Sequence, residues 1–226
     1  MVADIDIAEP ASLMGDPTRA AFLMALSEER ALPAGELARR AGVTASTASI
    51  QLAKLAEGGF LTAEQNGRHR YYSLADPAIA AAIEALAVIA PQRPAHSLKQ
   101  AKIGSDLQAA RTCYDHLAGA LGVALFDALV KGKLLTDDLD ATRKGERTFR
   151  ELGVDVDGAA AGRRPFTRRC LDWSERREHL AGALGAAIAT RFFELGWIER
   201  LPTSRAVRVT PAGRRALARE LSLRVA

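Results

Sequence analysis

The stretch of residues 43–74 constrains the fold most strongly, because it predicts a short amphipathic helix followed at once by a β-hairpin. After Thr44, apolar residues recur at the spacing of one helical face. They are Ala48, Leu52 and Leu55. Gly58-Gly59 then ends the helix. Two β-prone segments follow, 61–65 and 70–74, and Asn66-Gly67 between them is the dipeptide that most favours a tight hairpin turn.

Further helices precede and follow this pair. Those that precede it are predicted at residues 7–14, 17–26 and 33–41. Asp16-Pro17 supplies a cap and a proline at the first helical position. Only residues 42–44 separate the third helix from the fourth, which is the spacing of a helix-turn-helix pair. A last helix, 78–89, is apolar apart from Glu84, so we expect it to pack against a partner subunit.

The polar face of the fourth helix suits the major groove of DNA. We expect Ser46, Thr47 and Gln51 to meet base edges, because hydroxyls pair with any base and glutamine can bond to adenine through both amide atoms. Ser49 and Lys54 are better placed for the DNA backbone. The remaining candidates on this helix are Thr44 and Ile50, the latter through a thymine methyl group or by packing on the second helix.

Positive charge at the hairpin tip, from Arg68, His69 and Arg70, would reach phosphates or the minor groove. The formal net charge of +4 is unevenly distributed. Residues 1–95 hold 8 Lys and Arg against 11 Asp and Glu, a net of −3, and the remainder carries +7. Either the local charge at the tip suffices for phosphate contact, or the C-terminal half also touches DNA.

Composition indicates a protein of the cytoplasm with two domains. The 226 residues are 48% apolar, without a membrane-length apolar run and without a signal pattern at the N-terminus. Two cysteines, Cys113 and Cys170, are too few for a disulfide framework, so we expect both to be reduced. Helix breakers at 91–94 predict a boundary between domains 1–91 and 92–226.

The second half contains an internal repeat. Residues 116–122 recur unchanged as 179–185, each copy starting with histidine. Each continues as an apolar helix and reaches a T-x-x-G-x-R element, at 142–147 and 210–215. The order helix, turn, hairpin, helix predicts two winged-helix-like units that pack as a pseudo-symmetric pair. They span about 105–157 and 168–226. The expected fold is mainly α with small β-hairpins: a winged helix-turn-helix plus a duplicated helix/hairpin domain.

Several motifs of the first ninety or so residues stand in a recognisable order. They are LMGDPTR at 13–19, STASIQLAKL at 46–55, GGFL at 58–61 and the wing at 67–72. Together they resemble the ArsR/SmtB family of bacterial winged-helix repressors, whose recognition helix reads S-x-x-S-x-H-L-x-x-L. Gln51 stands where that family usually has histidine. The resemblance covers the first two-fifths of the chain, and it implies a homodimer that binds a palindromic operator and is released by an effector.

The best-known metal sites of that family are absent from the expected places. They use cysteines in the third helix, or Asp and His ligands in the last helix of the dimer interface. Here residues 33–41 contain neither Cys nor His, and residues 76–89 contain no His. An effector site would therefore lie in the second half or at the subunit interface.

One effector candidate is a thiophilic metal such as zinc. Cys113 and His116 are three residues apart, on one face of an expected helix, and Cys170 with His179 would complete four soft ligands. The repeat argues against this site, because an offset of 63 places Arg176 opposite Cys113. The two histidines are explained as well by caps or packing contacts at the start of each helix.

Two other effectors stay open. Redox sensing is one, because several arginines before Cys170 would favour its thiolate. They are Arg163, Arg164, Arg168 and Arg169. The other is an organic ligand between the repeats, in a pocket lined by aromatic residues. The candidates for its lining are Tyr114, Trp173, Phe192 and Trp197.

We therefore expect a sequence-specific transcriptional regulator that is not an enzyme, whose partners are double-stranded operator DNA, a second copy of the chain and an effector. One alternative is a structural protein that binds DNA without sequence preference. Another is an enzyme that uses the Cys/His set of the second half. Its residues would be Cys113, His116, Cys170, Asp172 and His179. The small residues of the repeat let helices approach closely and do not form a nucleotide-binding loop.

Overall fold

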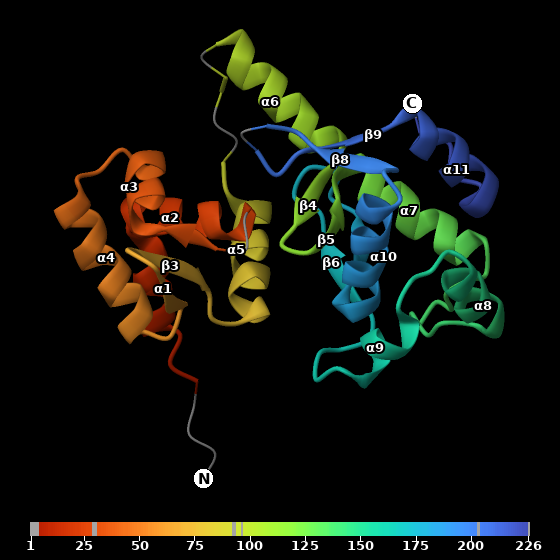
Figure 1. Ribbon diagram of the computed structural model, residues 1–226, viewed down its shortest axis with the longest axis horizontal. Helices are drawn as coiled ribbons and strands as arrows, with labels where there is room; N and C mark the ends of the chain where they lie inside the picture. The colour runs from red at the N-terminus through yellow and green to blue at the C-terminus, as the bar shows by residue number, and fades with distance from the viewer. Residues whose placement is uncertain (1–4, 29–30, 92–93, 96, 203, 226) are drawn as a thin grey trace. The chain divides into compact units, whose positions relative to one another are not determined.

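The structure is a computed structural model that describes residues 5–28, 31–91, 94–95, 97–202 and 204–225. Within this part the chain is mainly helical with small antiparallel hairpins, as the sequence predicts (Figure 1). It divides into two units, Met1–Ile83 and Glu84–Ala226. Of the helix breakers at 91–94, Gln92 and Arg93 lie outside the described residues. No helix in the described part is long and apolar enough to cross a membrane.

The first unit has the element order of a winged helix. Its elements are α1 (Ala8–Gly15), α2 (Pro17–Glu28), β1 (Leu32–Pro33), α3 (Ala34–Ala41), α4 (Ala45–Glu57), β2 (Leu61–Asn66) and β3 (His69–Leu74). The strand order is β1-β3-β2. α5 (Pro77–Ile89) follows and continues past the boundary between the units. The predicted helices are confirmed to within two residues at each end.

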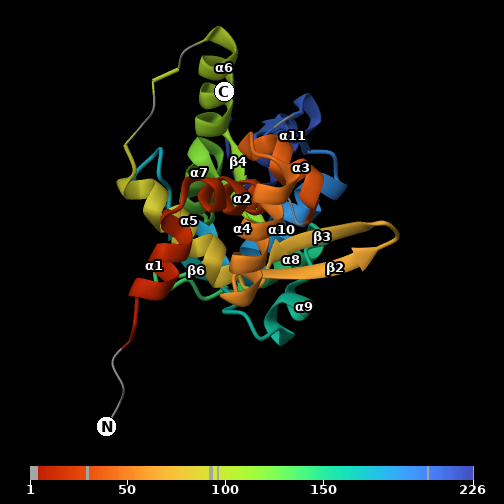
Figure 2. The same ribbon diagram turned by 90° about the vertical axis from the view of Figure 1, so that its left-hand side faces the viewer.

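Local interactions explain why α4 and the hairpin form where they do. Gly42 ends α3 with a left-handed φ of 67°. The Thr44 hydroxyl caps α4 by accepting a hydrogen bond from the Thr47 N–H at 3.2 Å. In the hairpin, Asn66 pairs with His69, so the turn is Gly67-Arg68, one residue later than predicted. Figure 2 shows the hairpin extending beyond the helices of its unit.

The second unit is built from two copies of a hairpin followed by two or more helices. Its elements are α6 (Leu98–Ala109), β4 (Arg111–Cys113), β5 (His116–Ala118), α7 (Gly119–Lys131), α8 (Arg143–Glu151), α9 (Val156–Ala161), β6 (Arg168–Leu171), β7 (Glu178–Ala181), α10 (Gly182–Glu194), β8 (Ile198–Arg200), β9 (Val207–Val209) and α11 (Pro211–Leu221). Buried side chains from both copies form one hydrophobic cluster, so the two copies share a core.

The T-x-x-G elements have the same structural role in each copy. The hydroxyls of Thr142 and Thr210 cap α8 and α11, accepting hydrogen bonds from the N–H groups of Gly145 and Gly213. A Cβ atom at either glycine would lie 2.0 Å from a backbone carbonyl oxygen of the preceding turn. The copies differ before this cap: the second has the β8–β9 hairpin, and the first has a single bridge between Leu135 and Ala141.

The two copies exchange helices across their hairpins. α7 of the first copy packs on β7 of the second, and α10 packs on β5. Gly122 and Gly185 act within their own copies: a Cβ atom on either would lie 2.4 or 2.7 Å from the carbonyl oxygen of Leu117 or Leu180, five residues earlier in the strand that leads into the same helix. The small residues of the repeat therefore bring helices close to strands, whereas the sequence predicted close approach between helices.

The structure corrects the prediction that Cys113 and His116 share a helical face. They are directly paired across the β4–β5 hairpin, and Tyr114 in the turn has a left-handed φ of 60°. The helix α7 starts only at Gly119, with Ala118 as its N-cap, and α10 is likewise capped by Ala181. The histidines therefore lie in strands and do not cap the helices.

Candidate nucleic-acid interface and Cys/His centre

The ten predicted DNA contacts all lie on α4, its cap and the tip of the β2–β3 hairpin. The three basic tip residues are exposed, as are Ser46, Ser49 and Lys54, whereas Thr47 and Gln51 are half-buried. Ile50 is 58% exposed, so it does not pack against the second helix. The Arg70 guanidinium lies over the Tyr72 ring, 5.6 Å from its centroid.

Gln51 has a partner that the sequence did not reveal. Its Oε1 accepts a hydrogen bond from Arg19 Nη1 at 2.8 Å. Arg19 also donates to the backbone carbonyls of Ser12 and Leu13 at 2.7 Å, so it links α1, α2 and α4. Arg19, the last residue of the LMGDPTR motif, therefore holds the side-chain amide of Gln51. The Nε2 group of Gln51 remains to donate to another partner.

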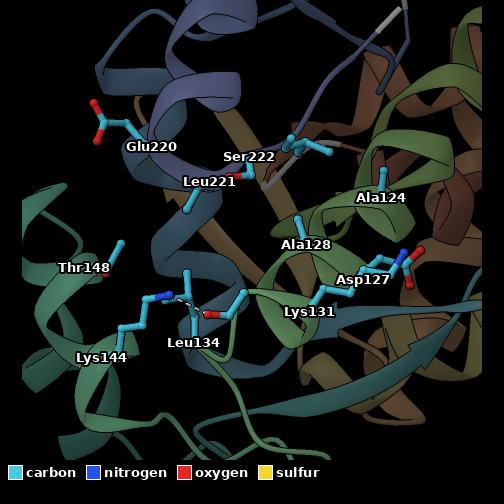
Figure 3. Close-up of a pocket in the computed structure, with 12 residues that line it drawn as sticks. Ala124, Asp127, Ala128, Lys131, Leu134, Lys144, Thr148, Glu220, Leu221 and Ser222 are labelled. Atoms are coloured by element: carbon cyan, nitrogen blue, oxygen red, sulfur yellow. Dashed lines mark hydrogen bonds between the residues drawn. The ribbon is translucent and has the colours of Figure 1, made fainter.

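Aromatic side chains do not gather into a ligand pocket in the described part of the second unit. Phe192 packs against Trp197 within the core, with ring centroids 5.0 Å apart, and Trp173 lies under the Arg111 guanidinium. A cavity of about 530 Å³ lies between α7, α8 and the end of α11 (Figure 3). Its lining includes Lys131, Lys144 and Leu221, but none of the four aromatic residues predicted to hold a ligand.

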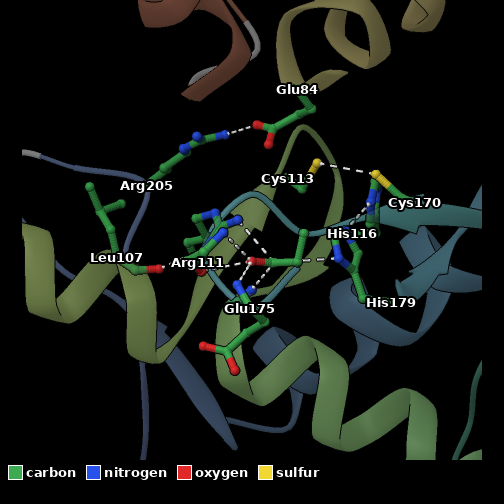
Figure 4. A network of polar contacts seen from close by, with 12 residues as sticks. Glu84, Leu107, Arg111, Cys113, His116, Cys170, Glu175, His179 and Arg205 are labelled. Carbon is green, nitrogen blue, oxygen red and sulfur yellow. Dashed lines mark hydrogen bonds and ion pairs between the residues drawn. The ribbon is translucent and has the colours of Figure 1, made fainter. Parts of the chain in front are cut away.

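Two cysteines and two histidines meet between the two hairpins (Figure 4). Cys113 is paired with His116 in one hairpin and Cys170 with His179 in the other. The two sulfur atoms are 3.9 Å apart and the two Nε2 atoms 3.2 Å apart. All four donor atoms lie within 4.8 Å of one another, so the group could hold a metal ion. Cys170 is half-buried and the other three are buried.

The strand register shows that the repeat does place a cysteine opposite Cys113, which removes the sequence-based argument against a four-residue metal site. The histidines are separated by 63 residues but the cysteines by 57, because eight residues lie between Cys170 and His179 and only two between Cys113 and His116. Cys170, and not Arg176, is therefore the equivalent of Cys113. A signal for this was present, since the first strand of each hairpin and its turn read R-x-C-x-D, at 111–115 and 168–172.

Each histidine has an aspartate beside its other ring nitrogen. Asp115 Oδ1 is 3.4 Å from His116 Nδ1, and Asp172 Oδ2 is 3.4 Å from His179 Nδ1. A carboxylate in this position favours the proton on Nδ1 and leaves the Nε2 lone pair free. The Nδ1 atom of His179 is buried without a well-aligned hydrogen bond.

Asp172 is held by a buried network that the sequence analysis missed. Its Oδ2 accepts from Arg111 Nη2 at 2.9 Å and from the Gly119 N–H at 2.7 Å, and the Ser174 hydroxyl donates to Oδ1 at 2.6 Å. The side chains of Arg111 and Asp172 are both fully buried. Burial opposes ionisation, but these hydrogen bonds and the Arg111 charge lower the pKa of Asp172 well below its usual range.

The hydrogen bond between the two sulfur atoms shifts the pKa values of the two thiols in opposite directions. The contact with Cys170, together with burial, raises the pKa of the Cys113 thiol. The same contact lowers the pKa of Cys170 against the effect of burial, and His116 and His179 add to the lowering. Burial disfavours the His116 cation, but Asp115 and Cys170 outweigh it and raise the His116 pKa. These shifts favour the thiolate form at Cys170 and the thiol form at Cys113.

A buried ion pair joins α5 to the neighbourhood of this centre within the second unit. Glu84 of α5 pairs with Arg205, and both side chains are 3% exposed. The Arg205 carbonyl accepts a hydrogen bond from the N–H of Thr112, the residue before Cys113, at 3.0 Å. The one charged residue of the apolar α5 helix is therefore part of this contact network.

Sequence comparison relates almost the whole chain to one HTH-type transcriptional regulator. Residues 14–64 match the family described as Helix-turn-helix domain. The chain is 45% identical over 223 residues to YdfF, an uncharacterized HTH-type transcriptional regulator of Bacillus subtilis (strain 168), and the match covers 97% of this chain and 99% of that protein.

Solved structures match a smaller part of the chain. The transcriptional repressor BigR from Xylella fastidiosa is 26% identical, covers 38% of this chain and 88% of its own, and has a TM-score of 0.36. The cadmium metal-sensor CMTR from Mycobacterium tuberculosis is 30% identical, covers 41% of this chain and 99% of its own, and has a TM-score of 0.33.

Proposed function

The chain belongs to the ArsR/SmtB family of winged-helix transcriptional regulators, and from that premise we propose that it is a homodimeric repressor released from its operator by an effector. The observation that carries the proposal is the exposed polar face of α4 beside the basic hairpin tip. On this proposal α4 enters the major groove and the hairpin tip contacts the flanking backbone or minor groove.

The hydrogen bond from Arg19 limits which base groups Gln51 would recognise in DNA. Because Oε1 already accepts from Arg19, Nε2 is the free donor, and a base acceptor such as purine N7 or thymine O4 suits it. Ser46 and Thr47 would supply further base contacts, while Ser49 and Lys54 would meet the backbone. Thr44 would act mainly as the cap that aims the helix.

Operator binding is tested with DNA from upstream of the protein's own gene. We expect a protected two-fold symmetric site at two chains per site. Gln51→Ala should weaken binding by about 1–3 kcal/mol and relax the base preference at one position per half-site. Gln108→Ala, an exposed glutamine of α6, is the matched control. Equal loss on all sequences, or affinity without preference and with a steep salt dependence, would identify a non-specific DNA-binding protein instead.

Dimerisation is proposed through the apolar surface left at the end of α5. Leu86 and Ile89 are 47% and 78% exposed. Neighbouring apolar side chains exposed on one helix suit a protein partner, and the family resemblance makes a second copy the expected one. Native mass spectrometry should show a dimer, which Ile89→Glu should weaken.

We propose that the effector is a thiophilic metal such as zinc, bound by Cys113, His116, Cys170 and His179. Zinc–sulfur bonds of about 2.3 Å and zinc–nitrogen bonds of about 2.0–2.1 Å give tetrahedral edges of about 3.8 Å between sulfurs and about 3.3–3.4 Å between nitrogens. The corresponding separations here are 3.9 and 3.2 Å. A metal ion at the centre would take the place of the Nε2–Nε2 contact and bind both nitrogen atoms.

Metal binding is tested on the full chain after chelation and reduction. Titration with cobalt(II), whose thiolate charge-transfer absorption reports sulfur ligation, should saturate at one ion per chain. His179→Ala should abolish tight binding, whereas His69→Ala, at the exposed hairpin tip, should leave it unchanged. Cys113→Ser with Cys170→Ser should keep operator binding and remove the metal response. Binding that survives this double substitution would place the metal elsewhere.

The same contacts argue against an enzyme built on these residues. Four protein side chains surround the centre, which leaves no open position of the kind that a catalytic zinc keeps for substrate. The Asp172 carboxylate is already occupied by Arg111, Ser174 and Gly119. We therefore assign the centre to sensing.

A further inference from the structure

The two cysteines of the chain come from different copies of the repeat, and both are free thiols. Their sulfur atoms lie 3.9 Å apart. A disulfide bond of about 2.05 Å would require the sulfurs to approach by roughly 1.9 Å. Side-chain rotation, or a shift of the strands that carry the two cysteines, would have to supply this approach.

The two sulfurs differ in access to solvent. Cys113 is 2% exposed, whereas Cys170 is only half-buried. Cys170 is therefore the sulfur that a reagent from solvent reaches first, and Cys113 is the buried partner beside it (Figure 4). This is the arrangement of an attacking and a resolving thiol.

We propose that Cys113 and Cys170 form a reversible disulfide when the protein meets a hydroperoxide, and that this disulfide and a bound metal ion exclude each other. The exclusion rests on the metal site proposed above. The disulfide itself rests only on the positions of the two sulfurs.

The chemistry proceeds in two steps. The Cys170 thiol is oxidised to a sulfenic acid as the O–O bond of the hydroperoxide breaks and the reduced oxidant leaves as an alcohol, or as water from hydrogen peroxide. The Cys113 sulfur then attacks the sulfenic sulfur. The S–S bond forms, and the sulfenic hydroxyl leaves as water with the Cys113 hydrogen. A dithiol reductant reverses the oxidation by thiol–disulfide exchange.

Exclusion of the metal follows from geometry and charge. The sulfurs of a disulfide are about 2.05 Å apart, whereas two thiolates on one tetrahedral zinc are separated by about 3.8 Å. A disulfide also carries no thiolate charge with which to hold a cation. Oxidation therefore releases the ion, and a bound ion protects both sulfurs.

The experiment uses the full-length, chelated and reduced protein with one equivalent of hydrogen peroxide. Intact mass spectrometry should show loss of two hydrogen atoms per chain, and proteolysis without reductant should yield a linked Cys113–Cys170 peptide. Cys113→Ser should instead stop at a Cys170 sulfenic acid that a cyclic diketone traps, and Cys170→Ser should react at least tenfold more slowly. Circular dichroism of both variants confirms that they are folded.

A linked peptide between chains, or no linked peptide, would overturn the disulfide. Zinc- or cobalt-loaded protein should react at least tenfold more slowly than the apo protein, and complete oxidation should reduce bound metal to below a tenth of the loaded amount. Oxidation at an equal rate with the metal retained would overturn the exclusion. A protein that forms the linked peptide but binds no metal would refute the metal effector and leave the disulfide standing.

Discussion

The β4–β5 and β6–β7 hairpins present the same two side chains at the same strand positions, but they support them differently. The first has the two-residue turn Tyr114-Asp115, and Asp115 is held by Arg164, whose side chain is 37% exposed. The second has a longer turn that buries Asp172 fully against Arg111. One histidine is thus backed by a partly exposed ion pair and the other by a fully buried one.

The two hairpins therefore have some features in common and others that differ. Both copies have the same strand register and the same glycine at the start of the following helix, so equivalent substitutions there should have equal effects on stability. The hydrogen bonds around Asp115 differ from those around Asp172, so substitutions in them should have unequal effects. Buried charge is costly when its partner is lost, whereas a partly exposed pair contributes little.

The largest difference between the hairpins is expected in the loss of stability when Arg111 or Arg164 is replaced. Arg111→Met leaves the Asp172 carboxylate buried without its cation and should lower the free energy of unfolding by about 3–5 kcal/mol. Arg164→Met should cost less than about 1 kcal/mol, because water can reach Asp115 in its place. Urea unfolding measures both. Similar losses for the two variants would mean that burial does not distinguish the hairpins.

The next effect should be equal in both copies. Gly122→Ala and Gly185→Ala each force a Cβ against a carbonyl oxygen, at 2.4 and 2.7 Å, and should each cost about 1–3 kcal/mol of stability. Gly104→Ala in α6 is the control, since its Cβ meets nothing within 4 Å. A loss in only one repeat copy would show that the junctions between strand and helix are not equivalent in the two copies.

A smaller effect is expected on metal affinity. Asp115→Asn and Asp172→Asn both weaken the orientation of a histidine, and loss of such a partner costs about 10–100-fold in affinity. We expect Asp172→Asn at the upper end of this range and Asp115→Asn at the lower end. Competition with a chromophoric chelator gives both constants. The reverse order would indicate that the exposed pair orients its histidine more firmly.

The smallest effect is the dependence of stability on acid. The pKa values of Asp115 and Asp172 are lowered in the folded protein, so each contributes stability above its unfolded pKa of about 3.9 and loses it as the pH falls through the folded value. Unfolding at pH 5 and below should show a decline in stability. Asp172→Asn should flatten that decline more than Asp115→Asn, and an equal flattening would contradict the comparison.

The first unit was predictable because its signals are local. Thr44 as a cap, Gly42 and Gly58-Gly59 as helix ends and the Asn66-Gly67 pair each act within a few residues. What the sequence could not show there was a contact between distant positions, the bond from Arg19 to Gln51 across 32 residues.

The Cys/His centre was predictable in composition but not in geometry. The sequence identifies all four residues, but it predicts one helical face for Cys113 and His116, because their spacing of three also fits a helix. Reading the repeat at a constant offset then hid the equivalence of the cysteines, since the two turns differ in length. Strand pairing depends on such turns, which periodicity does not detect.

The packing of each helix, α7 or α10, on the hairpin of the other copy has a consequence for how the second unit folds and how it arose. Each hairpin packs most extensively against the helix of the other copy, so a copy expressed alone would leave part of its strand surface uncovered. Pairing with an identical chain would cover that surface and place the Cys/His centre on a two-fold axis. Joining two copies in one gene removes the concentration dependence of that assembly, and it frees the second turn to lengthen and carry the Asp172 network.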